Sequence, residues 1–350
     1  LWVAVPPADI VVTNTAETVQ REYWVDPVAG DDDNAGTSAN APLKTLAKVA
    51  ANLALTASDA KLNLRMLVHC AAGDYSEGGV TVSEPDVMSR LALTDYRLLV
   101  RFKGAGRGQS FISGAPDPDS ADGRGPNAVR CLYFAASSQG RVAVQGFTLC
   151  NGFADAGDAD EPRNQGGLVW CGGGTGAHQV LDGELVGGDA FRGGIAMRGD
   201  FLRCIFRDAV ARGGGGTRGV SICNSVFVGG VGPVIGSDTS VRQTTISSTN
   251  GVAVLNSTTN RFAIAFQATG CTSGLNLKNG DLCRGLCYSF DNGKKVAGDT
   301  EGISTRAGDL RFVDFAHDDL RLRSDSPLVM DPIALDADYW KAPVTDVAGV

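Results

Sequence analysis

The sequence has few of the residues on which metal and nucleophile chemistry usually depends. It contains only three histidines, His69, His178 and His317, and they are far apart in the chain. None of its nine cysteines forms a CxxC pair, which excludes a zinc ribbon and a thioredoxin-type redox motif. There is no Gly-x-Ser-x-Gly elbow and no Walker loop. Neither a serine hydrolase of that type nor a P-loop nucleotide site is therefore indicated.

Long apolar runs and excess positive charge are also missing. No apolar run approaches the ~18–20 residues of a transmembrane helix. The 39 acidic and 31 basic residues give a net charge of -8, which argues against nucleic acid and anionic membranes as partners. The chain opens with Leu1 rather than Met, so we expect it to be a processed or trimmed piece of a longer protein.

Glycine, in contrast, is abundant. The 350 residues include 46 glycines, nearly double the ~7% of average usage. Because 43% of the chain is apolar, it can bury a core and is not a disordered linker. The length slightly exceeds the ~250–300 residues at which one globular core stops growing. The chain is therefore either two ordinary domains or one solenoid.

A repeat decides between these alternatives. From about residue 98 to residue 290 the chain alternates short β runs with Gly or Asn turns, and comparable apolar positions recur at Val186, Phe206, Phe227, Ile246 and Phe266. These positions are 20, 21, 19 and 20 residues apart. A period of about 20 residues with glycine at the corners predicts a β-solenoid. We expect Gly or Asn at corners that need a left-handed backbone.

The cysteines fit such a stacked core. Most of them lie inside apolar β runs, so we interpret them as small buried hydrophobic residues. Disulfides between neighbouring layers are the alternative, with Cys283 and Cys287 as the nearest pair. One helix is predicted over residues 42–56, where Leu43, Leu46, Val49 and Leu53 have helical spacing and Pro42 occupies the first turn.

Four segments resemble a known family. They are YWVDPVAGDDDNAGTSANAPLKT (23–45), VHCAAGDYSEG (68–78), RGGGG (212–216) and DLRFVDFAHDDLRLRSDSPLVMD (309–331). They resemble the opening, first coil, repeated turn and closing coil of right-handed parallel β-helix proteins of the pectate-lyase-like superfamily. PVTDVAGV (343–350) is similar to the start of a further segment in a bacterial secreted subgroup with a choice-of-anchor Q domain.

The resemblance implies an all-β, right-handed parallel β-helix of about nine coils with an N-terminal capping helix. It predicts a cap and first coils over 21–97, the coils and closing coil over 98–332, and a tail over 333–350. Residues 1–20 have no counterpart in the family, and their own sequence predicts an extended β segment. The resemblance also implies a protein that lies outside the cell or on its surface.

An acidic loop is a candidate metal site. Asp31, Asp32, Asp33 and Asn34 are oxygen-rich, as a calcium site would be. The spacing is not that of an EF-hand. The alternative is a loop whose side chains bond their own backbone and cap the helix.

Two further clusters are candidate sites. The insertion at 153–167 interrupts the coils and carries candidate ligand-binding residues, namely Asp155, Asp158, Asp160, Glu161 and Arg163. A second loop spans 115–126. The resemblance also implies a chemistry, because polysaccharide lyases with this fold bind a uronate through calcium and use a Lys or Arg as the base. The catalytic candidates on this basis are Arg192, Arg212, Asp189 and Asp208. A ladder of surface ion pairs is the alternative.

Two functions remain open. The first is a non-catalytic module for adhesion, carbohydrate contact or extracellular assembly, with polysaccharide or further copies of the chain, joined through residues 1–20, as partners. The second is a polysaccharide lyase or glycoside hydrolase acting on an acidic glycan in a lateral groove. No lysine lies between Lys103 and Lys278, which counts against a lysine base in the central coils. Adjacent aspartates occur only at 31–33 and 318–319, which counts against the glycosidase pattern.

Overall fold

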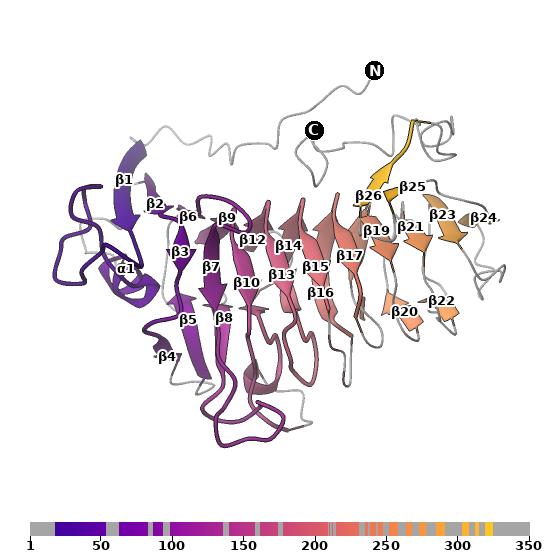
Figure 1. The fold of residues 1–350 in the computed structure, drawn as a ribbon, viewed down its shortest axis with the longest axis horizontal. Helices are drawn as coiled ribbons and strands as arrows, with labels where there is room; N and C mark the ends of the chain where they lie inside the picture. The colour runs from indigo at the N-terminus through magenta and orange to yellow at the C-terminus, as the bar shows by residue number, and fades with distance from the viewer. Residues whose placement is uncertain are drawn as a thin grey trace.

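The chain folds as a parallel β-helix whose strands stack along the long axis of the molecule (Figure 1). The computed structural model describes residues 18–53, 63–82, 87–93, 99–135, 140–157, 162–173, 178–208, 210, 212, 215–230, 235–236, 239–242, 244–247, 252–257, 264–267, 273–277, 285–290, 303–307, 312–314 and 319–324. All pairs between successive coils are parallel, as solenoid geometry requires. The predicted fold class is therefore confirmed.

Three faces are built from these strands. The first face contains β1 (Thr18–Val25), β2 (Asn63–Cys70), β6 (Leu99–Lys103), β9 (Arg141–Gln145), β12 (His178–Leu181), the second halves of β14 (Ala196–Leu202) and β16 (Thr217–Cys223), and β18 (Ser240–Arg242). The third face contains β4 (Val80–Val82), β5 (Val87–Leu93), β8 (Val129–Phe134), β11 (Val169–Cys171) and the first halves of β14 and β16. These two faces form one sheet because β14 pairs with β11 by its first residues and with β12 by its last.

The second face is a ten-stranded sheet. It contains β3 (Gly73–Asp74), β7 (Ser110–Ser113), β10 (Thr148–Cys150), β13 (Glu184–Val186), β15 (Ile205–Arg207), β17 (Val226–Val228), β19 (Thr244–Ser247), β21 (Ile264–Gln267), β23 (Gly285–Phe290) and β24 (Ile303–Ala307). Separate pairs are formed by β20 (Val252–Ser257) with β22 (Ser273–Leu277), and by β25 (Phe312–Asp314) with β26 (Asp319–Leu322).

The predicted repeat needs two corrections. On the second face Phe206 pairs with Leu185, not with Val186, which instead pairs with Arg207. Leu185 is fully buried whereas Val186 is half-buried, because a shift of one residue moves a strand side chain to the opposite face. Successive partners on the first face are His69, Lys103, Gln145, Leu181, Leu202 and Cys223. A spacing near 20 residues is found only from Leu181 onward, so the predicted period begins later in the chain than expected.

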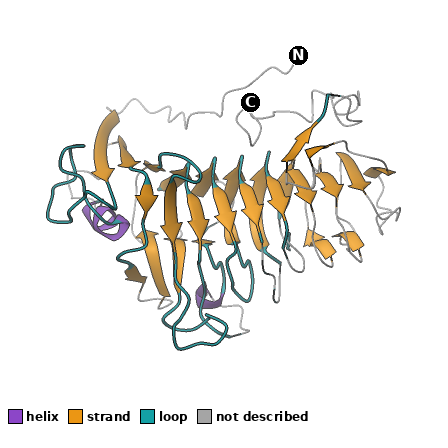
Figure 2. Cartoon of the chain, in the orientation of Figure 1, coloured by secondary structure: helices purple, strands orange, loops and turns teal. Residues whose placement is uncertain are grey.

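The longer early coils carry loops at a single corner, where the second face ends and the third begins. The loop at 114–128 and the described parts of the loop at 151–168 lie there in successive coils, between β7 and β8 and between β10 and β11. Figure 2 shows them in teal below the strands. The bridges Phe153 to Asp189 and Gln165 to Arg192 hold the second loop against the next coil.

Backbone twists recur at the corners in register. The residue after the last strand residue of the first face is left-handed in four successive coils, at Gly146, Asp182, Arg203 and Asn224. The residue after the second face is left-handed as well, at Asn151, Gly187, Asp208 and Gly229. The predicted Gly and Asn corners are thus confirmed, although Asp and Arg also occupy them despite the cost of that conformation.

The helix is shorter than predicted. Helix α1 spans Leu46–Asn52, with Thr45 as its N-cap. Pro42 and Leu43 precede it, and Leu43 instead forms a β-bridge with Val25 at the end of the solenoid. The physical reason is that Asp32 accepts hydrogen bonds from the Lys44 and Thr45 amides, which fixes those residues outside the helix. Apart from α1, the described residues contain one 3-10 turn, at Pro162–Asn164.

The interior confirms the interpretation of the cysteines as buried residues for four of the six that are described. Six of them, Cys70, Cys131, Cys150, Cys171, Cys204 and Cys223, are free, and four of these are buried among apolar side chains. The side chains of Cys271, Cys283 and Cys287 lie outside the described residues. The boundary predicted after residue 20 falls inside β1. Among the described residues, no helix is long and apolar enough to span a membrane.

Removing one ring from the stacked core tests the importance of the ladder. The rings of Phe206 and Phe227 are stacked with their centroids 4.4 Å apart, and both are about 1% exposed. We expect Phe206→Ala to lower the free energy of unfolding by about 3–5 kcal/mol, because the cavity cannot refill. Denaturant titration measures this value. The control Val28→Ala alters an 81% exposed side chain and should change it by less than about 0.5 kcal/mol. Equal effects of the two substitutions would contradict the stacked-core account.

Candidate functional site

In the acidic loop that precedes α1, the side chains form hydrogen bonds with nearby backbone groups. Asp32 Oδ1 accepts from the Lys44 and Thr45 amides at 2.8 and 2.9 Å, and its Oδ2 accepts from the Thr45 hydroxyl at 2.7 Å. Asp31 accepts from the Asp33 amide, and the Asn34 side chain donates to the Pro42 carbonyl. The alternative reading of this loop, as a turn that caps the helix, matches this geometry.

The charge of Asp32 follows from the same contacts. Burial raises the pKa of the Asp32 carboxyl, but the hydrogen bonds from Thr45 and Lys44 outweigh burial and leave the pKa below its usual value. In the described part of the chain, no group of three or more His, Cys, Asp or Glu side chains is placed to hold a metal ion. Calcium at Asp31, Asp32, Asp33 and Asn34 stays a prediction.

The weak catalytic candidates Asp189 and Arg212 form an ion pair with each other. The Arg212 guanidinium donates to both carboxylate oxygens of Asp189, at 2.7 and 2.5 Å, and lies 3.7 Å from Asp122. The hydrogen bonds from Arg212 to Asp189 raise the pKa of Arg212, which is opposite to what a proton-abstracting base needs. Similar pairs join Asp182 to Arg203 and Glu184 to Arg207, and in each of them the arginine belongs to the coil that follows the acidic residue.

The other two catalytic candidates have different surroundings. Arg192 lies over the ring of Phe191, 5.6 Å from its centroid. Asp208 is the left-handed corner residue after β15, equivalent to Gly187 and Gly229 in the neighbouring coils. The position of Asp208 is therefore explained by the corner geometry. The contacts of Asp189 and Arg212 match the alternative of a cross-coil ion-pair ladder.

The candidate ligand-binding loop is fastened to the solenoid. Asp155 and Arg163 are 3.7 Å apart, while Asp158, Asp160 and Glu161 lie outside the described residues. Arg130 donates to the carbonyls of Pro162 and Arg163. Burial lowers the pKa of Arg130 to about 10, so its guanidinium keeps its charge at neutral pH.

A different group of residues meets on the outer side of the first face. The strand register places Trp24 of β1 beside His69 of β2, and His69 beside Lys103 of β6. Glu22 lies two residues before Trp24 on the same side of its strand. These residues are up to 81 positions apart in the sequence, and parallel pairing brings them together. We call Trp24 and His69, with Glu22 and Lys103 beside them, the platform.

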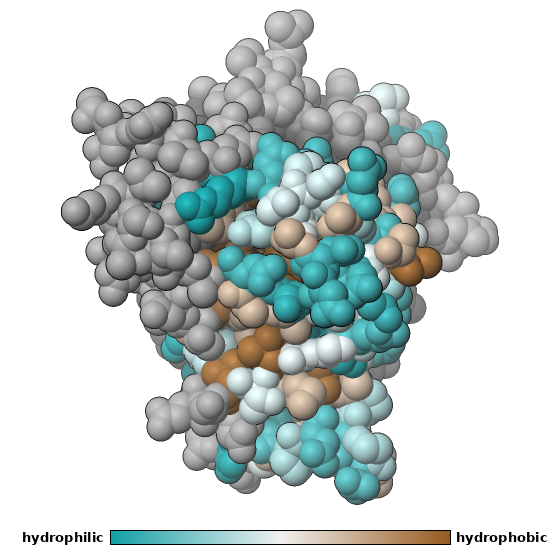
Figure 3. All heavy atoms as spheres, turned by 90° about the vertical axis from the view of Figure 1, so that its left-hand side faces the viewer, coloured by the Kyte–Doolittle hydropathy of each residue, from teal (hydrophilic) through white to brown (hydrophobic). Residues whose placement is uncertain are grey.

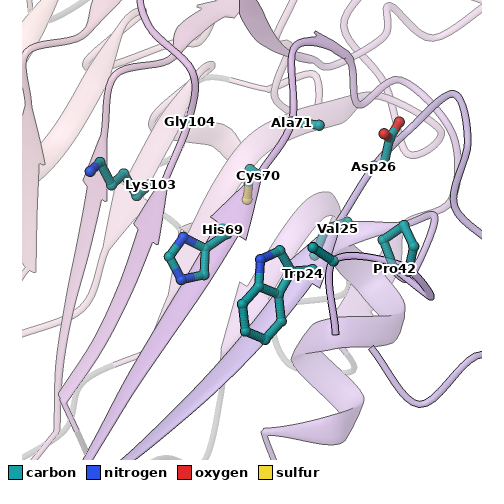
Figure 4. A pocket seen from close by; sticks show the side chains of 10 residues that line it. Trp24, Val25, Asp26, Pro42, His69, Cys70, Ala71, Lys103 and Gly104 are labelled. Carbon is teal, nitrogen blue, oxygen red and sulfur yellow. The ribbon is translucent and has the colours of Figure 1, made fainter. Parts of the chain in front are cut away.

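The two rings of the platform are stacked. The centroids of Trp24 and His69 are 4.9 Å apart with an interplanar angle of 15°. His69 Nε2 lies 3.0 Å from Glu22 Oε2, and both side chains are about one-third exposed, at 34% and 37%. Figure 4 shows the two rings next to each other, with Lys103 on the other side of His69. The hydrogen bond to Glu22 fixes the orientation of the imidazole ring.

A cavity opens beside this stack. It has a volume of about 330 Å³ and is lined by Trp24, Val25, Asp26, Ala39, Pro42, His69, Cys70, Ala71, Lys103 and Gly104. The cap loop therefore supplies one wall and the first three strands of the face supply the floor. Figure 3 views the molecule from this end, where polar residues cover most of the described surface and apolar residues show between them.

The charged side chains around the cavity differ in whether they already bond other groups of the protein. Asp26 accepts from the amides of Val28 and Ala29, and Arg101 donates to the Gln145 side chain at 2.6 Å. Lys103 is exposed, and no residue in the described ranges forms an ion pair with it. The platform therefore combines an aromatic surface, a carboxylate–imidazole pair and an available ammonium group.

Sequence reasoning missed this site. Trp24 and His69 occur in the opening and first-coil segments, where they serve as markers of the fold rather than as functional residues. Their only sequence signal is that a Trp and a His stand at outward positions of two early strands. The separation of 45 residues between them is not a coil period of this chain, so spacing does not pair them.

Comparisons with known proteins add little to this site. No family model matches the chain, and no curated protein matches it. One matching solved structure is a GH136 lacto-N-biosidase from Eubacterium ramulus, with 12% identity over 82% of this chain and 68% of that chain. The TM-score is 0.31. At this level the likeness carries no argument about the site, and the fold rests on the strand pairing of this chain.

The acidic loop can be tested by a matched pair of variants. We expect Asp32→Asn to lower the free energy of unfolding by about 1 kcal/mol at neutral pH, because three hydrogen bonds lose a charged acceptor. Asp33→Asn alters an exposed carboxylate and should change it by less than about 0.5 kcal/mol. Denaturant titrations of both variants give these values.

The same pair has a pH signature. The folded pKa of Asp32 is lowered, so its stabilisation is complete above the unfolded value of about 3.9 and is lost as the pH falls through the folded pKa. The deficit of Asp32→Asn should therefore shrink in acid. Stabilisation of the wild type by added calcium, lost in both variants, would instead support the predicted calcium site.

Proposed function

We propose that this β-helix is a carbohydrate-binding module and that the platform is its binding surface. The observation that carries the proposal is the Trp24–His69 stack at the edge of a cavity of about 330 Å³. Ligand pockets of this kind combine aromatic walls with a few polar groups that fix orientation. A sugar ring presents apolar C–H groups on its faces and hydroxyls at its edge, which suits that combination.

The polar groups of the platform support an acidic glycan. The ammonium of Lys103 can pair with a sugar carboxylate, and the Glu22–His69 pair can bond sugar hydroxyls. The polar network that runs on from the platform is already satisfied within the protein, since the Gln145 side chain bonds both Arg101 and Asp182. An acidic ligand therefore gains most of its electrostatic binding free energy beside Lys103.

A second candidate is the lyase or glycoside hydrolase activity that the fold resemblance suggests. The observation in its favour is the 3.0 Å hydrogen bond between His69 and Glu22, since a carboxylate-oriented imidazole can transfer protons. The corner residues support it less, because the Arg212 guanidinium is held by Asp189. Catalysis, if present, is therefore placed at the platform in this proposal.

The wider setting is also part of the proposal. We infer a location outside the cell, and kinship with the choice-of-anchor Q subgroup, from the motif resemblance alone. Assembly through residues 1–20 stays a prediction. Thr18, Val19 and Gln20 pair within the chain with β2, and residues 1–17 lie outside the described residues.

Binding should depend on the stacked ring. We expect Trp24→Ala to weaken binding of any glycan retained by the wild type by about tenfold or more, because the stacking surface is lost. Affinity electrophoresis on a panel of acidic and neutral polysaccharides measures retention. The control Phe191→Ala removes an aromatic ring at the loop corner and should leave retention unchanged. The reverse result would move the site to the corner and overturn the proposal.

Catalysis has a separate readout. If the platform supports β-elimination, uronate polysaccharides should give unsaturated products with ultraviolet absorbance, and Glu22→Gln and His69→Gln should reduce the rate while Arg212→Ala retains it. If glycans are bound but no substrate gives a product, the result would support the non-catalytic binding module and not the lyase. Loss of activity in Arg212→Ala alone would indicate that the catalytic residues lie at the corner with Asp189 and Arg212, and not at the platform.

A further inference from the structure

Four neighbouring strands of the first face carry positive charge and no negative charge. β2, β6, β9 and β12 contain no Asp or Glu, although the chain has 39 acidic residues and a net charge of -8. The basic residues of these strands are Arg65, Arg101, Lys103 and Arg141. These strands are therefore positive within an acidic chain, and a region of this kind attracts anions.

Three of these cations point away from the core. Arg101 and Lys103 are exposed, while Val100 and Phe102 beside them on β6 are buried. Arg141 is exposed at the start of β9. Because successive side chains of a strand lie on opposite sides of the sheet, the three charged groups are on the outer side of the first face. We call Arg101, Lys103 and Arg141 the basic surface.

The basic side chains differ in their contacts within the protein. Arg65 is half-buried and already has a partner in the protein, so it is not counted as a binding group. Arg101 donates to the side chain of Gln145, and this amide is uncharged, so the contact leaves the charge of Arg101 unneutralised. Lys103 and Arg141 form no ion pair with any residue in the described ranges. The basic surface therefore presents three positive charges to a ligand.

The strand register sets these charges on a line that starts at the platform. Lys103 lies opposite His69 of the platform, and Arg101 lies two residues before Lys103 on the same strand. Arg141 lies in the next coil, opposite Leu99. With roughly 3.3 Å per strand residue and about 4.8 Å between coils, the Cα atoms of Lys103 and Arg141 are about 14 Å apart. One acidic sugar cannot pair with all three cations, whereas a chain of several acidic sugars can.

We infer that the binding surface extends from the platform across β6 and β9 and takes a polyanionic glycan chain, with acidic groups of successive sugars beside Lys103, Arg101 and Arg141. This inference rests on the proposed function at one end of the surface and adds the length and charge of the ligand. At the platform, one acidic sugar gains chiefly from Lys103, and a longer chain reaches the two arginines as well. A guanidinium suits this role because it donates two parallel hydrogen bonds to one acidic group.

The first test is how the affinity depends on ligand length. The probes are oligomannuronates and sulfated heparin oligosaccharides of two, four and eight sugars, titrated calorimetrically at low and high salt. We expect the affinity to rise roughly tenfold from the disaccharide to the octasaccharide, because two further ion pairs each add about threefold. Salt should weaken binding of the octasaccharide more than that of the disaccharide. A neutral series of the same lengths is the control for added sugar rings alone.

Single substitutions assign the gain to residues of the basic surface. Arg101→Gln and Arg141→Gln should each weaken binding of the octasaccharide about threefold, and Arg141→Gln should leave the disaccharide unchanged. Arg141→Lys keeps the charge and should bind like the wild type. The control Arg207→Gln removes the same charge from the second face, where Glu184 already pairs with it, and should bind both ligands like the wild type.

The outcomes separate this inference from the proposed function. The inference is overturned if length adds no more than in the neutral series, or if Arg207→Gln weakens the octasaccharide as much as Arg141→Gln does. It is also overturned if an oligothymidylate of equal charge binds as tightly as the glycans. If short glycans are then still retained and Trp24→Ala releases them, the proposed function stands alone. If Trp24→Ala has no effect while Arg101→Gln and Arg141→Gln weaken the octasaccharide, the platform fails as a site and the basic surface stands.

Discussion

Parallel pairing between successive coils is the constraint on which the rest of this structure depends. Each strand bonds the same strand of the next coil about 4.8 Å away, so a residue in one coil lies over its equivalent in the next. Inside the solenoid this produces the column that runs from Leu185 through Phe206 and Phe227. At the corners it requires the same backbone turn in each coil, which is why Asp182, Arg203 and Asn224 share a left-handed conformation.

The same constraint places charges opposite each other. On the outside of the second face and at its corners, an acidic residue in one coil meets a basic residue in the next, as Glu184 meets Arg207 and Asp189 meets Arg212. Exposed ion pairs of this kind each contribute little to stability. They do engage the charges of Glu184, Arg207, Asp189 and Arg212, which are then not available to a ligand.

The N-terminal end has one pair of this kind, between Glu22 and His69, but the next outward position is not matched. Lys103 faces a histidine on one side and a glutamine on the other, so its charge has no carboxylate across the coil. His69 stacks on Trp24 as well as bonding Glu22. The cap loop, which closes the end of the solenoid, adds a wall at Ala39 and Pro42. A cavity lined by a stacked aromatic pair and an exposed ammonium group results where the repeat begins.

The sequence by itself determined the fold class, the corner glycines and asparagines, the burial of four cysteines and the presence of a capping helix. These follow from local patterns such as turn residues, alternation and a period of about 20 residues. It did not determine the start of the helix, because Asp32 acts on Lys44 and Thr45 from twelve and thirteen residues away. It also did not determine the register of Leu185 over Phe206, since adjacent Leu and Val are equally apolar.

Only the tertiary structure decided where the functional groups meet. Asp189 and Arg212 are recognisable in the sequence as a charged ladder, but whether they open a groove or bond each other depends on the direction of their side chains. Trp24, His69 and Lys103 come from coils whose lengths are altered by loops, so no fixed spacing connects them. Their proximity follows from strand register, which is set by the whole stack rather than by any segment of the chain.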